Sequence, residues 1–332
     1  MQTGSDIAAG GASTAGGARA SVSRIWPYVE IARPDHWAKN IFVLPGIVLA
    51  LWIAPDLDLT NLAINTYIGL CSICLIASSN YVLNEIMDGP ADRHHPTKKK
   101  RPVPSGRVKL PLAYAEWLAL MALGMWTAWT VSAPFAATML TLWVMGLVYN
   151  VPPVRSKDLP YLDVLSESVN NPLRMLAGWY IVGAIAVPPA SLLVSYWMIG
   201  CYFMAMKRFA EFRQIDDPSV AASYRKSFAY YCEERLLVSI MFYAAAAMLF
   251  FGVFIMRYRL ELILAFPLVA LLMALYLWIG LKDDSPVQNP ENLYLELPLT
   301  LTAAACTAVM LGCLLIDMPA FRALFLPIYP AP

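Results

Sequence analysis

The sequence predicts an all-α membrane protein, a bundle of nine transmembrane helices. Of its 332 residues, 59% are hydrophobic and only 14% are charged, and the mean hydropathy is +0.56. Soluble domains carry about 45–50% apolar and about 25% charged residues. Nine stretches are long and apolar enough for a bilayer core of about 30 Å, and Lys and Arg gather in alternate connections between them. The composition therefore argues against a soluble enzyme and a disordered chain.

The nine stretches follow one another with mostly short connections. They lie near residues 36–54, 62–87, 111–131, 133–149, 161–185, 189–207, 235–256, 260–281 and 297–317. Residues 1–28 are rich in Gly, Ala and Ser and predict a disordered tail. We expect residues 29–320 to form one catalytic domain and residues 321–332 to form a short tail outside the cytosol.

The basic residues predict how the bundle is oriented. Twenty of the 24 Lys and Arg residues fall in the N-terminal segment up to Lys39 or in and at the edges of the connections on the same side, three fall on the other side, and Arg174 lies within the fifth stretch. An excess of Lys and Arg marks cytoplasmic loops. We therefore expect a protein of the cytoplasmic membrane, with a cytosolic N-terminus and a C-terminus outside. The net charge of +1 argues against a nucleic-acid partner.

The second stretch ends in an acidic helix face. Its polar residues recur every four positions: Asn80, Asn84, Asp88 and Asp92. Such residues share one side of a helix. Gly89-Pro90 predicts that the helix ends there, which would place Asp92 on the following loop.

A basic run follows this face at Lys98, Lys99, Lys100 and Arg101. Carboxylates suit Mg²⁺, and Lys and Arg suit phosphate oxygens, so the two together suit a Mg²⁺–diphosphate. The alternative is an acidic cap at the membrane border beside a topology signal.

The fifth stretch carries a second polar stripe. Asp163, Glu167 and Arg174 share one helix side, with Asn170 or Asn171 between them. A charge at the bilayer centre costs at least about 2.5–3.5 kcal/mol, so the stripe must face a polar cavity. The alternative is an internal ion pair of Glu167 with Arg174. The predicted topology brings Asp163 to the same membrane face as Asp88.

The sixth stretch returns to that face with Lys207, which can either reach a phosphate or pair with Glu211.

The run Asn84-Glu85-x-x-Asp88-x-x-x-Asp92 resembles the N-D-x-x-D-x-x-x-D motif of the UbiA superfamily of intramembrane prenyltransferases. The resemblance covers roughly residues 30–317. It implies a nine-helix bundle with acidic motifs on the second and fifth helices, and Mg²⁺ as the cofactor that binds a diphosphate.

Three segments resemble the decaprenyl-phosphate phosphoribosyltransferase group of that superfamily. They are residues 33–40, residues 92–102 with His95-Pro96, and residues 207–211 followed by 225–227. Two features depart from that group. Glu85 replaces the usual Asp, and the loop from Tyr149 to Asp158 resembles the Y-x-x-P-P-x-R-x-K loop of prenyl-transferring members, as Asp163-x-x-x-Glu167 resembles their second acidic motif.

These patterns and resemblances assign candidate roles. The candidate catalytic residues are Asp88, Asp92, Asp163 and Glu167. The candidate Mg²⁺ ligands are Asn84, Asp88, Asp92 and Asp163. The candidate substrate contacts are Lys39, Asn84, Lys98, Arg101, Tyr149, Lys157, Arg174 and Lys207.

The favoured function is transfer of 5-phosphoribose from phosphoribosyl diphosphate to a polyprenyl phosphate. The alternative within the superfamily is prenyl transfer from a polyprenyl diphosphate to an aromatic or other lipid acceptor. A cation-coupled transporter is the rival from another class. Transporters place their sites near the bilayer midplane in repeated halves, whereas the acids here gather at one face and the halves do not match.

Overall fold

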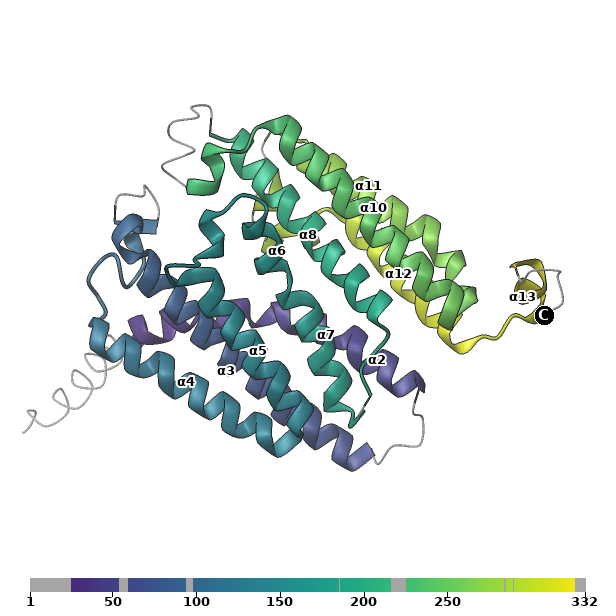
Figure 1. Ribbon diagram of the computed structural model, residues 1–332, viewed down its shortest axis with the longest axis horizontal. Helices are drawn as coiled ribbons and strands as arrows, with labels where there is room; N and C mark the ends of the chain where they lie inside the picture. The colour runs from purple at the N-terminus through teal and green to yellow at the C-terminus, as the bar shows by residue number, and fades with distance from the viewer. Residues whose placement is uncertain are drawn as a thin grey trace, which may run out of the picture.

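The computed structural model describes residues 25–53, 59–93, 98–184, 186–215, 225–283, 285–288 and 290–325. This part of the chain is helical and contains no strand (Figure 1). The all-α fold class is therefore confirmed. Most of the two expected tails and the His95-Pro96 segment lie outside the described residues.

The first half of the chain builds one side of the bundle. Residues 25–32 are helical. The elements that follow are η1 (Pro34–Val43), α2 (Leu44–Ile53), α3 (Leu59–Asp92), η2 (Lys98–Lys100), α4 (Leu110–Val131) and α5 (Ala133–Asn150). Helix α3 packs against both α4 and α5, as Figure 1 shows.

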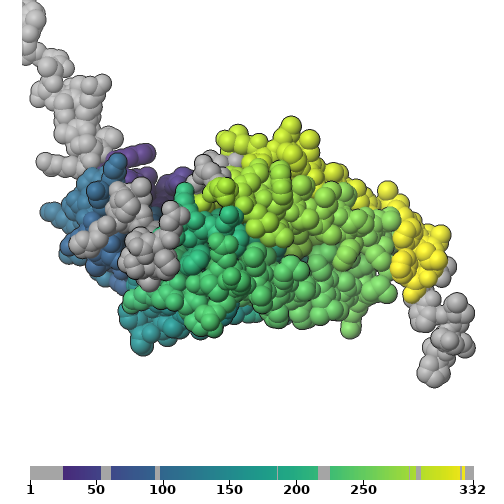
Figure 2. All heavy atoms as spheres, turned by 90° about the horizontal axis from the view of Figure 1, so that it is seen from above, coloured from purple at the N-terminus to yellow at the C-terminus, as the bar shows by residue number. Residues whose placement is uncertain are grey.

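The second half begins with short elements and ends in long helices. They are η3 (Ser156–Asp158), α6 (Leu162–Ser168), α7 (Asn170–Ile181), α8 (Ala190–Arg213), η4 (Lys226–Ala229), α10 (Glu233–Tyr258), η5 (Leu260–Ala265), α11 (Phe266–Gly280), η6 (Pro286–Gln288), η7 (Pro290–Leu295), α12 (Leu297–Leu315) and α13 (Pro319–Phe325). Helices α10, α11 and α12 lie together, α8 packs against α10, and α13 projects from their end (Figures 1 and 2).

The helices have the length and surface of membrane spans. Six segments of the described chain are long and apolar enough to cross a bilayer. Each of the nine expected ranges contains a helix, but the count of nine spans stays a prediction. Large apolar side chains such as Trp126, Leu249 and Val253 are exposed, which suits a surface surrounded by lipid.

Helix α3 continues past Gly89-Pro90, so the expected helix end there is wrong. Pro90 lies in the last turn, where its missing N–H removes only one bond near the end of the ladder. The amide of Arg93 still donates to the carbonyl of Gly89 at 3.3 Å. Asp92 consequently stays on the helix, one turn beyond Asp88.

The fifth expected stretch forms two consecutive helices. Helix α6 ends at Ser168, and α7 begins at Asn170 after one residue, Val169. The backbone of Val169 is itself close to helical, with φ −62° and ψ −20°, and its carbonyl accepts from the amide of Leu173 at 3.2 Å. The polar stripe therefore continues from α6 into α7.

Two glycines allow α2 and α7 to touch backbone to backbone. A Cβ atom on Gly46 would lie 1.9 Å from the carbonyl oxygen of Met175, and one on Gly178 would lie 2.1 Å from that of Val43. Small residues permit such close approach between helices in membranes. The contact holds α7 beside η1 and α2.

Candidate active site

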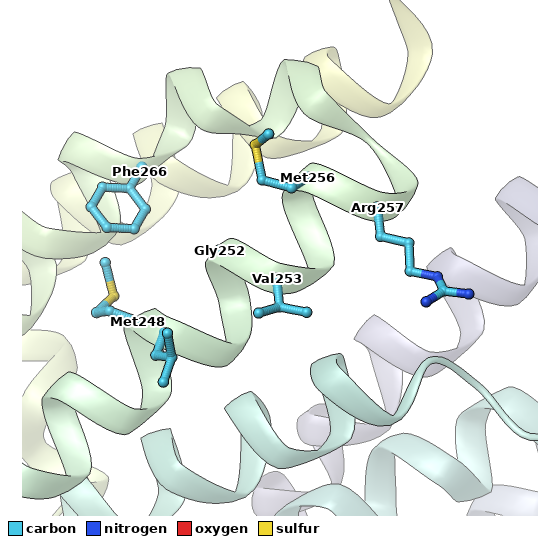
Figure 3. Close-up of a pocket in the computed structure, with 7 residues that line it drawn as sticks. Met248, Gly252, Val253, Met256, Arg257 and Phe266 are labelled. Carbon is cyan, nitrogen blue, oxygen red and sulfur yellow. The ribbon is translucent and has the colours of Figure 1, made fainter. Parts of the chain in front are cut away.

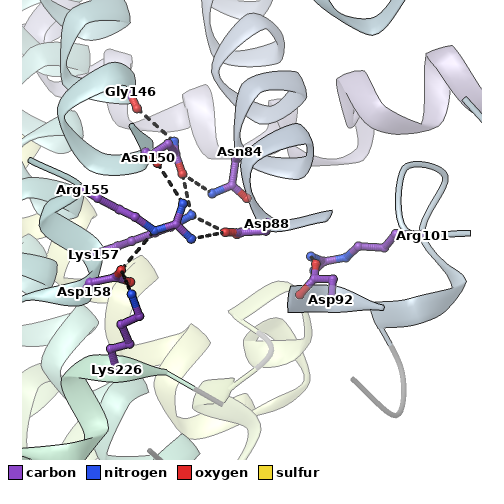
Figure 4. Close-up of polar contacts among 10 residues, drawn as sticks. All are labelled: Asn84, Asp88, Asp92, Arg101, Gly146, Asn150, Arg155, Lys157, Asp158 and Lys226. Carbon is purple, nitrogen blue, oxygen red and sulfur yellow. Dashed lines mark hydrogen bonds and ion pairs between the residues drawn. The ribbon is translucent and has the colours of Figure 1, made fainter. Parts of the chain in front are cut away.

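Asp88 is the centre of a polar cluster where α3, α5 and the loop after α5 meet (Figure 4). Its Oδ1 accepts a bond from Nζ of Lys157 at 2.5 Å and one from Nη2 of Arg155 at 3.0 Å. Arg155 also donates through Nε to Asp158 at 3.1 Å. Among the described residues both bonds to Asp88 use Oδ1, which leaves the lone pairs of Oδ2 for a further ligand.

Asn150, the last residue of α5, joins the acidic face of α3 to this basic loop. Its Oδ1 accepts from Nδ2 of Asn84 at 2.6 Å and from Nζ of Lys157 at 2.9 Å. Its own Nδ2 donates to the carbonyl of Gly146 at 2.9 Å. A Cβ on Gly146 would lie 2.2 Å from Oδ1 of Asn80, so glycine is needed for this close packing of α3 and α5.

Lys157 is a buried cation with incomplete compensation. Its side chain is only 6% exposed, and its ammonium lies 5.8 Å from the ring centre of Tyr149. Burial lowers the pKa of Lys157 to about 8. The Asp88 carboxylate opposes this shift, whereas Arg155 and Arg225 add to it. An anionic ligand would stabilise the charged form of such a lysine.

Asp92 belongs to a neighbouring ion pair. Its Oδ2 accepts from Nη1 of Arg101 at 2.8 Å (Figure 4). Lys98 lies close to this pair, and burial lowers its pKa, with Asp92 opposing the shift and Arg101 and Arg225 adding to it. The structure thus places Lys98 and Arg101 beside the acidic face of α3.

Asp163 lies in a second cluster, fully buried. Its Oδ1 accepts from the hydroxyl of Tyr231 at 2.6 Å. Its Oδ2 accepts from Ser227 at 3.2 Å and from Arg208 and Arg225 at 3.3 Å each. The role of Asp163 as a Mg²⁺ ligand stays a prediction, and these four donors leave little capacity for it.

The remaining candidates are spread over the inner wall. Arg174 donates through Nε to Asn40 at 3.2 Å. In the described part of the chain it forms no ion pair with Glu167, so that alternative is not supported. Lys39 is exposed on η1, and Lys207 is half-buried on α8. Their functional roles stay predictions.

The unexpected Glu85 has a packing role. It is buried, and its Oε1 accepts from the amide of Val103 at 3.1 Å, while Oε2 lies 3.6 Å from Nη2 of Arg33. Glu85 therefore ties the N-terminal segment and the loop after η2 to α3. None of the contacts described for Glu85 is with Asp88 or its partners.

The donor set on α3 fits a magnesium ion. No three His, Cys, Asp or Glu side chains among the described residues lie together as a preassembled metal centre. Asp88 and Asp92 supply carboxylates one turn apart, and Asn84 retains its amide oxygen. Mg²⁺ commonly takes only one or two carboxylates together with substrate phosphates. The residues therefore suit an ion shared with a bound diphosphate.

Five residues that complete these clusters were not assigned a role from the sequence. They are Asn150, Arg155, Arg225, Ser227 and Tyr231. The basic loop drew attention to Arg155 and the family resemblance to residues 225–227, whereas Asn150 and Tyr231 had no such signal. Their partners lie far away in the sequence, as Asp88 does from Arg155, 67 positions later.

An apolar groove lies elsewhere, on the second half of α10 (Figure 3). It is lined by Met248, Leu249, Gly252, Val253, Met256, Arg257 and Phe266. Helix α10 starts at Glu233, two residues after Tyr231 of the Asp163 cluster. At 1.5 Å per residue, the groove around Gly252 is about 28 Å further along the helix. It does not belong to the polar site.

The sequence matches the UbiA prenyltransferase family over residues 41–299, more than half of the chain. The chain belongs to the UbiA prenyltransferase family. The resemblance found in the acidic motifs is thereby confirmed. This UbiA-family chain is an integral membrane protein.

Curated relatives include two named decaprenyl-phosphate phosphoribosyltransferase. The protein from Mycolicibacterium smegmatis is 29% identical over 209 residues, which cover 63% of this chain and 63% of the relative. The protein from Mycobacterium tuberculosis is 28% identical over 225 residues, 68% of this chain and 72% of the relative. A 4-hydroxybenzoate octaprenyltransferase from Azotobacter vinelandii is 29% identical over 102 residues, 30% of this chain and 33% of the relative.

A solved structure has the same fold. It is a UbiA homolog from Archaeoglobus fulgidus bound to DMAPP and Mg²⁺, with a TM-score of 0.65 and 22% identity. The likeness covers 87% of this chain and 99% of that one. It places the UbiA-family chain in a known helical architecture.

Proposed function

We propose that this protein transfers the 5-phosphoribosyl group of phosphoribosyl diphosphate to a polyprenyl phosphate, with Mg²⁺ as cofactor. The observation that carries the proposal is the supply of cations. Arg155 and Lys157 bond to Asp88, Arg101 bonds to Asp92 with Lys98 close by, and Arg225 bonds to Asp163. One diphosphate does not need so many, but a donor with two phosphorylated positions and a phosphorylated acceptor does.

The relatives support the same choice. Two that share about two thirds of this chain are named decaprenyl-phosphate phosphoribosyltransferase, whereas the octaprenyltransferase match covers 30% of the chain. The first relative is matched over 63% of its own length, so its activity comes to this chain as a proposal.

In this proposal different residues bind the metal ion and the diphosphate. Asn84, Asp88 and Asp92 would hold the Mg²⁺, which neutralises the charge of the leaving diphosphate. Lys157 and Arg155, now bonded to the carboxylate of Asp88, would donate to diphosphate oxygens. Their positive charge stabilises the electron pair that the diphosphate takes as its bond to the anomeric carbon breaks.

The acceptor needs no strong base. A phosphate monoester is largely doubly ionised at neutral pH, because its second pKa is about 6. Its oxygen can therefore form the new bond to the anomeric carbon directly. The burial of Lys157 and Asn150 beside Asp88 limits the water that would hydrolyse the donor. We also propose that the site faces the cytosol, where phosphoribosyl diphosphate would enter.

A direct assay tests the proposal. Purified protein receives Mg²⁺, phosphoribosyl diphosphate labelled in the ribose, and a polyprenyl phosphate. Label should enter the lipid phase, and the Asp88→Asn variant should lose this transfer.

The alternative is prenyl transfer to an aromatic or other lipid acceptor. It is favoured by the residues 152–158 loop, whose Arg155 and Lys157 both reach Asp88. Absence of ribosyl transfer, together with prenyl transfer from a polyprenyl diphosphate to an aromatic acceptor, would establish this alternative instead.

A further inference from the structure

The carboxylate of Asp163 is saturated by protein donors. Its side chain is 0% exposed. Oδ2 alone accepts from Arg208, Arg225 and Ser227, and Oδ1 accepts from Tyr231. A carboxylate offers about four lone-pair positions, so a metal ion here would have to displace a hydrogen bond. The geometry favours a group that holds other side chains.

The four donors come from two places that Asp163 joins to α6. Arg208 belongs to α8, and it also binds Glu211 at 2.8 Å through Nη1. The other three donors belong to the segment from Arg225 to Tyr231 that leads into α10. Asp163 therefore holds this segment against α6 and α8.

Arg225 is more exposed than Arg208 and bonds to fewer carboxylates. Arg208 is 5% exposed and uses two carboxylates, whereas the Arg225 side chain is 21% exposed and bonds to Asp163 through Nη1. A guanidinium carries five N–H donors. Among the described residues, the donors of Arg225 contact Asp163 and the hydroxyl of Tyr149, which leaves further N–H groups for a ligand.

The positive charge of Arg225 also acts on lysines beside Asp88 and Asp92. Its charge is among those that act on Lys157 and on Lys98, on either side of the acidic face of α3. Cations that repel one another are stabilised by an anion that binds beside them. Arginine is well suited to such an anion because its planar donors match phosphate oxygens.

We propose that Asp163 is a positioning residue that orients Arg225 to bind a phosphate monoester of a substrate, and that it is not a metal ligand. The inference rests on the proposed phosphoribosyl transfer. The monoester is either the 5-phosphate of the donor or the phosphate of the polyprenyl acceptor. Both present the same dianionic group, and this second phosphate site is separate from the diphosphate site at Asp88.

The experiment compares Asp163→Asn, Arg225→Gln and the double variant with wild-type protein. Loss of a charge-assisted contact to phosphate should raise KM for one phosphate substrate about 10- to 100-fold in both single variants. The turnover number and the Mg²⁺ concentration for half-maximal activity should change less than about threefold. The double variant should be no worse than the more severe single one, because both act on one contact.

Two measurements identify the source of the phosphate. A raised KM for phosphoribosyl diphosphate, absent with a ribosyl diphosphate that lacks the 5-phosphate, assigns the site to the donor. A raised KM for polyprenyl phosphate assigns it to the acceptor. Either result supports the shared phosphate chemistry.

Glu261→Gln is the matched control. Glu261 is another fully buried carboxylate paired with an arginine, Arg259, at 3.3 Å, but it lies beyond the far end of α10. This variant should lower the melting temperature and leave both KM values unchanged. If Asp163→Asn does not fold, the proposal is tested by comparing Arg225→Gln with Arg225→Lys. The Lys variant should have a lower KM for the phosphate substrate than the Gln variant.

The proposal is overturned if Asp163→Asn raises the Mg²⁺ requirement tenfold or more, as expected for Asp88→Asn. It is also overturned if Arg225→Gln leaves both KM values unchanged. Wild-type protein without any ribosyl transfer would refute the proposed function instead. Calorimetry with inorganic phosphate in chelator would then still test the site: weaker binding to Arg225→Gln supports it, and equal or absent binding refutes it.

Discussion

Replacement of Asp88 by Asn should abolish catalysis while leaving the fold intact. The change keeps the shape of the side chain and removes its negative charge. Two cations lose a counter-ion, because Oδ1 of Asp88 accepts from both Lys157 at 2.5 Å and Arg155 at 3.0 Å. The diphosphate site loses a carboxylate that is placed to hold Mg²⁺.

For Asp88→Asn we expect a small loss in the free energy of unfolding and a large loss in reaction rate. Removing one partner of a fully buried ion pair costs about 3–5 kcal/mol. The Asp88 side chain is 23% exposed, Arg155 keeps Asp158, and Lys157 keeps Asn150. We therefore expect a loss of only about 1–2 kcal/mol in the free energy of unfolding. The rate should fall at least about 1,000-fold, equivalent to about 4 kcal/mol of transition-state stabilisation.

The assay measures label transfer and thermal unfolding on the same detergent-purified samples. Asp158→Asn is the matched control, because Asp158 is similarly exposed, accepts from Arg155 at 3.1 Å and lies 3.2 Å from Lys226. It should cost similar stability and reduce the rate less than about tenfold. An Asp88→Asn enzyme with more than a tenth of wild-type activity, or an Asp158→Asn enzyme equally impaired, would refute the reasoning.

Three further predictions follow from the same structure. Chelation of divalent ions should stop turnover and added Mg²⁺ should restore it; full activity in chelator would exclude the diphosphate mechanism. A reporter at the C-terminus should lie outside the cytosol and one within residues 98–109 inside, whereas a cytosolic C-terminus would mean an even number of spans. Gly146→Ala should lower stability by about 1–3 kcal/mol because its Cβ would meet Asn80 at 2.2 Å, and Gly252→Ala, with open space at its Cβ, should not; equal melting temperatures would contradict this.

Local sequence patterns predicted the elements and the acidic face of α3. A membrane span shows in about 20 apolar residues, and a shared helix face shows in four-residue spacing, so neither needs a partner to be recognised. Asn84, Asp88 and Asp92 all lie on α3, although Pro90 predicted an earlier helix end. Proline in a last turn removes too little hydrogen bonding to stop the helix.

The fifth expected stretch shows where local patterns fail. Asp163, Glu167 and Arg174 have regular helical spacing, and the near-helical backbone of Val169 continues it from α6 into α7. Arg174 nevertheless bonds to Asn40, which lies 134 residues earlier in the chain, and not to Glu167. A single helical face could not predict this partner, because it is supplied by the packing of a distant segment.

The same reason explains the two clusters. The sequence placed Asp88 and Asp163 at one membrane face through the alternation of spans and basic loops. Only the packing of η3 against α3 decided that Lys157, 69 residues away, neutralises Asp88. Only the packing of the segment before α10 against α6 decided that Tyr231, 68 residues away, binds Asp163. Periodicity fixes the direction in which a side chain points, whereas the group it meets depends on which helices pack together.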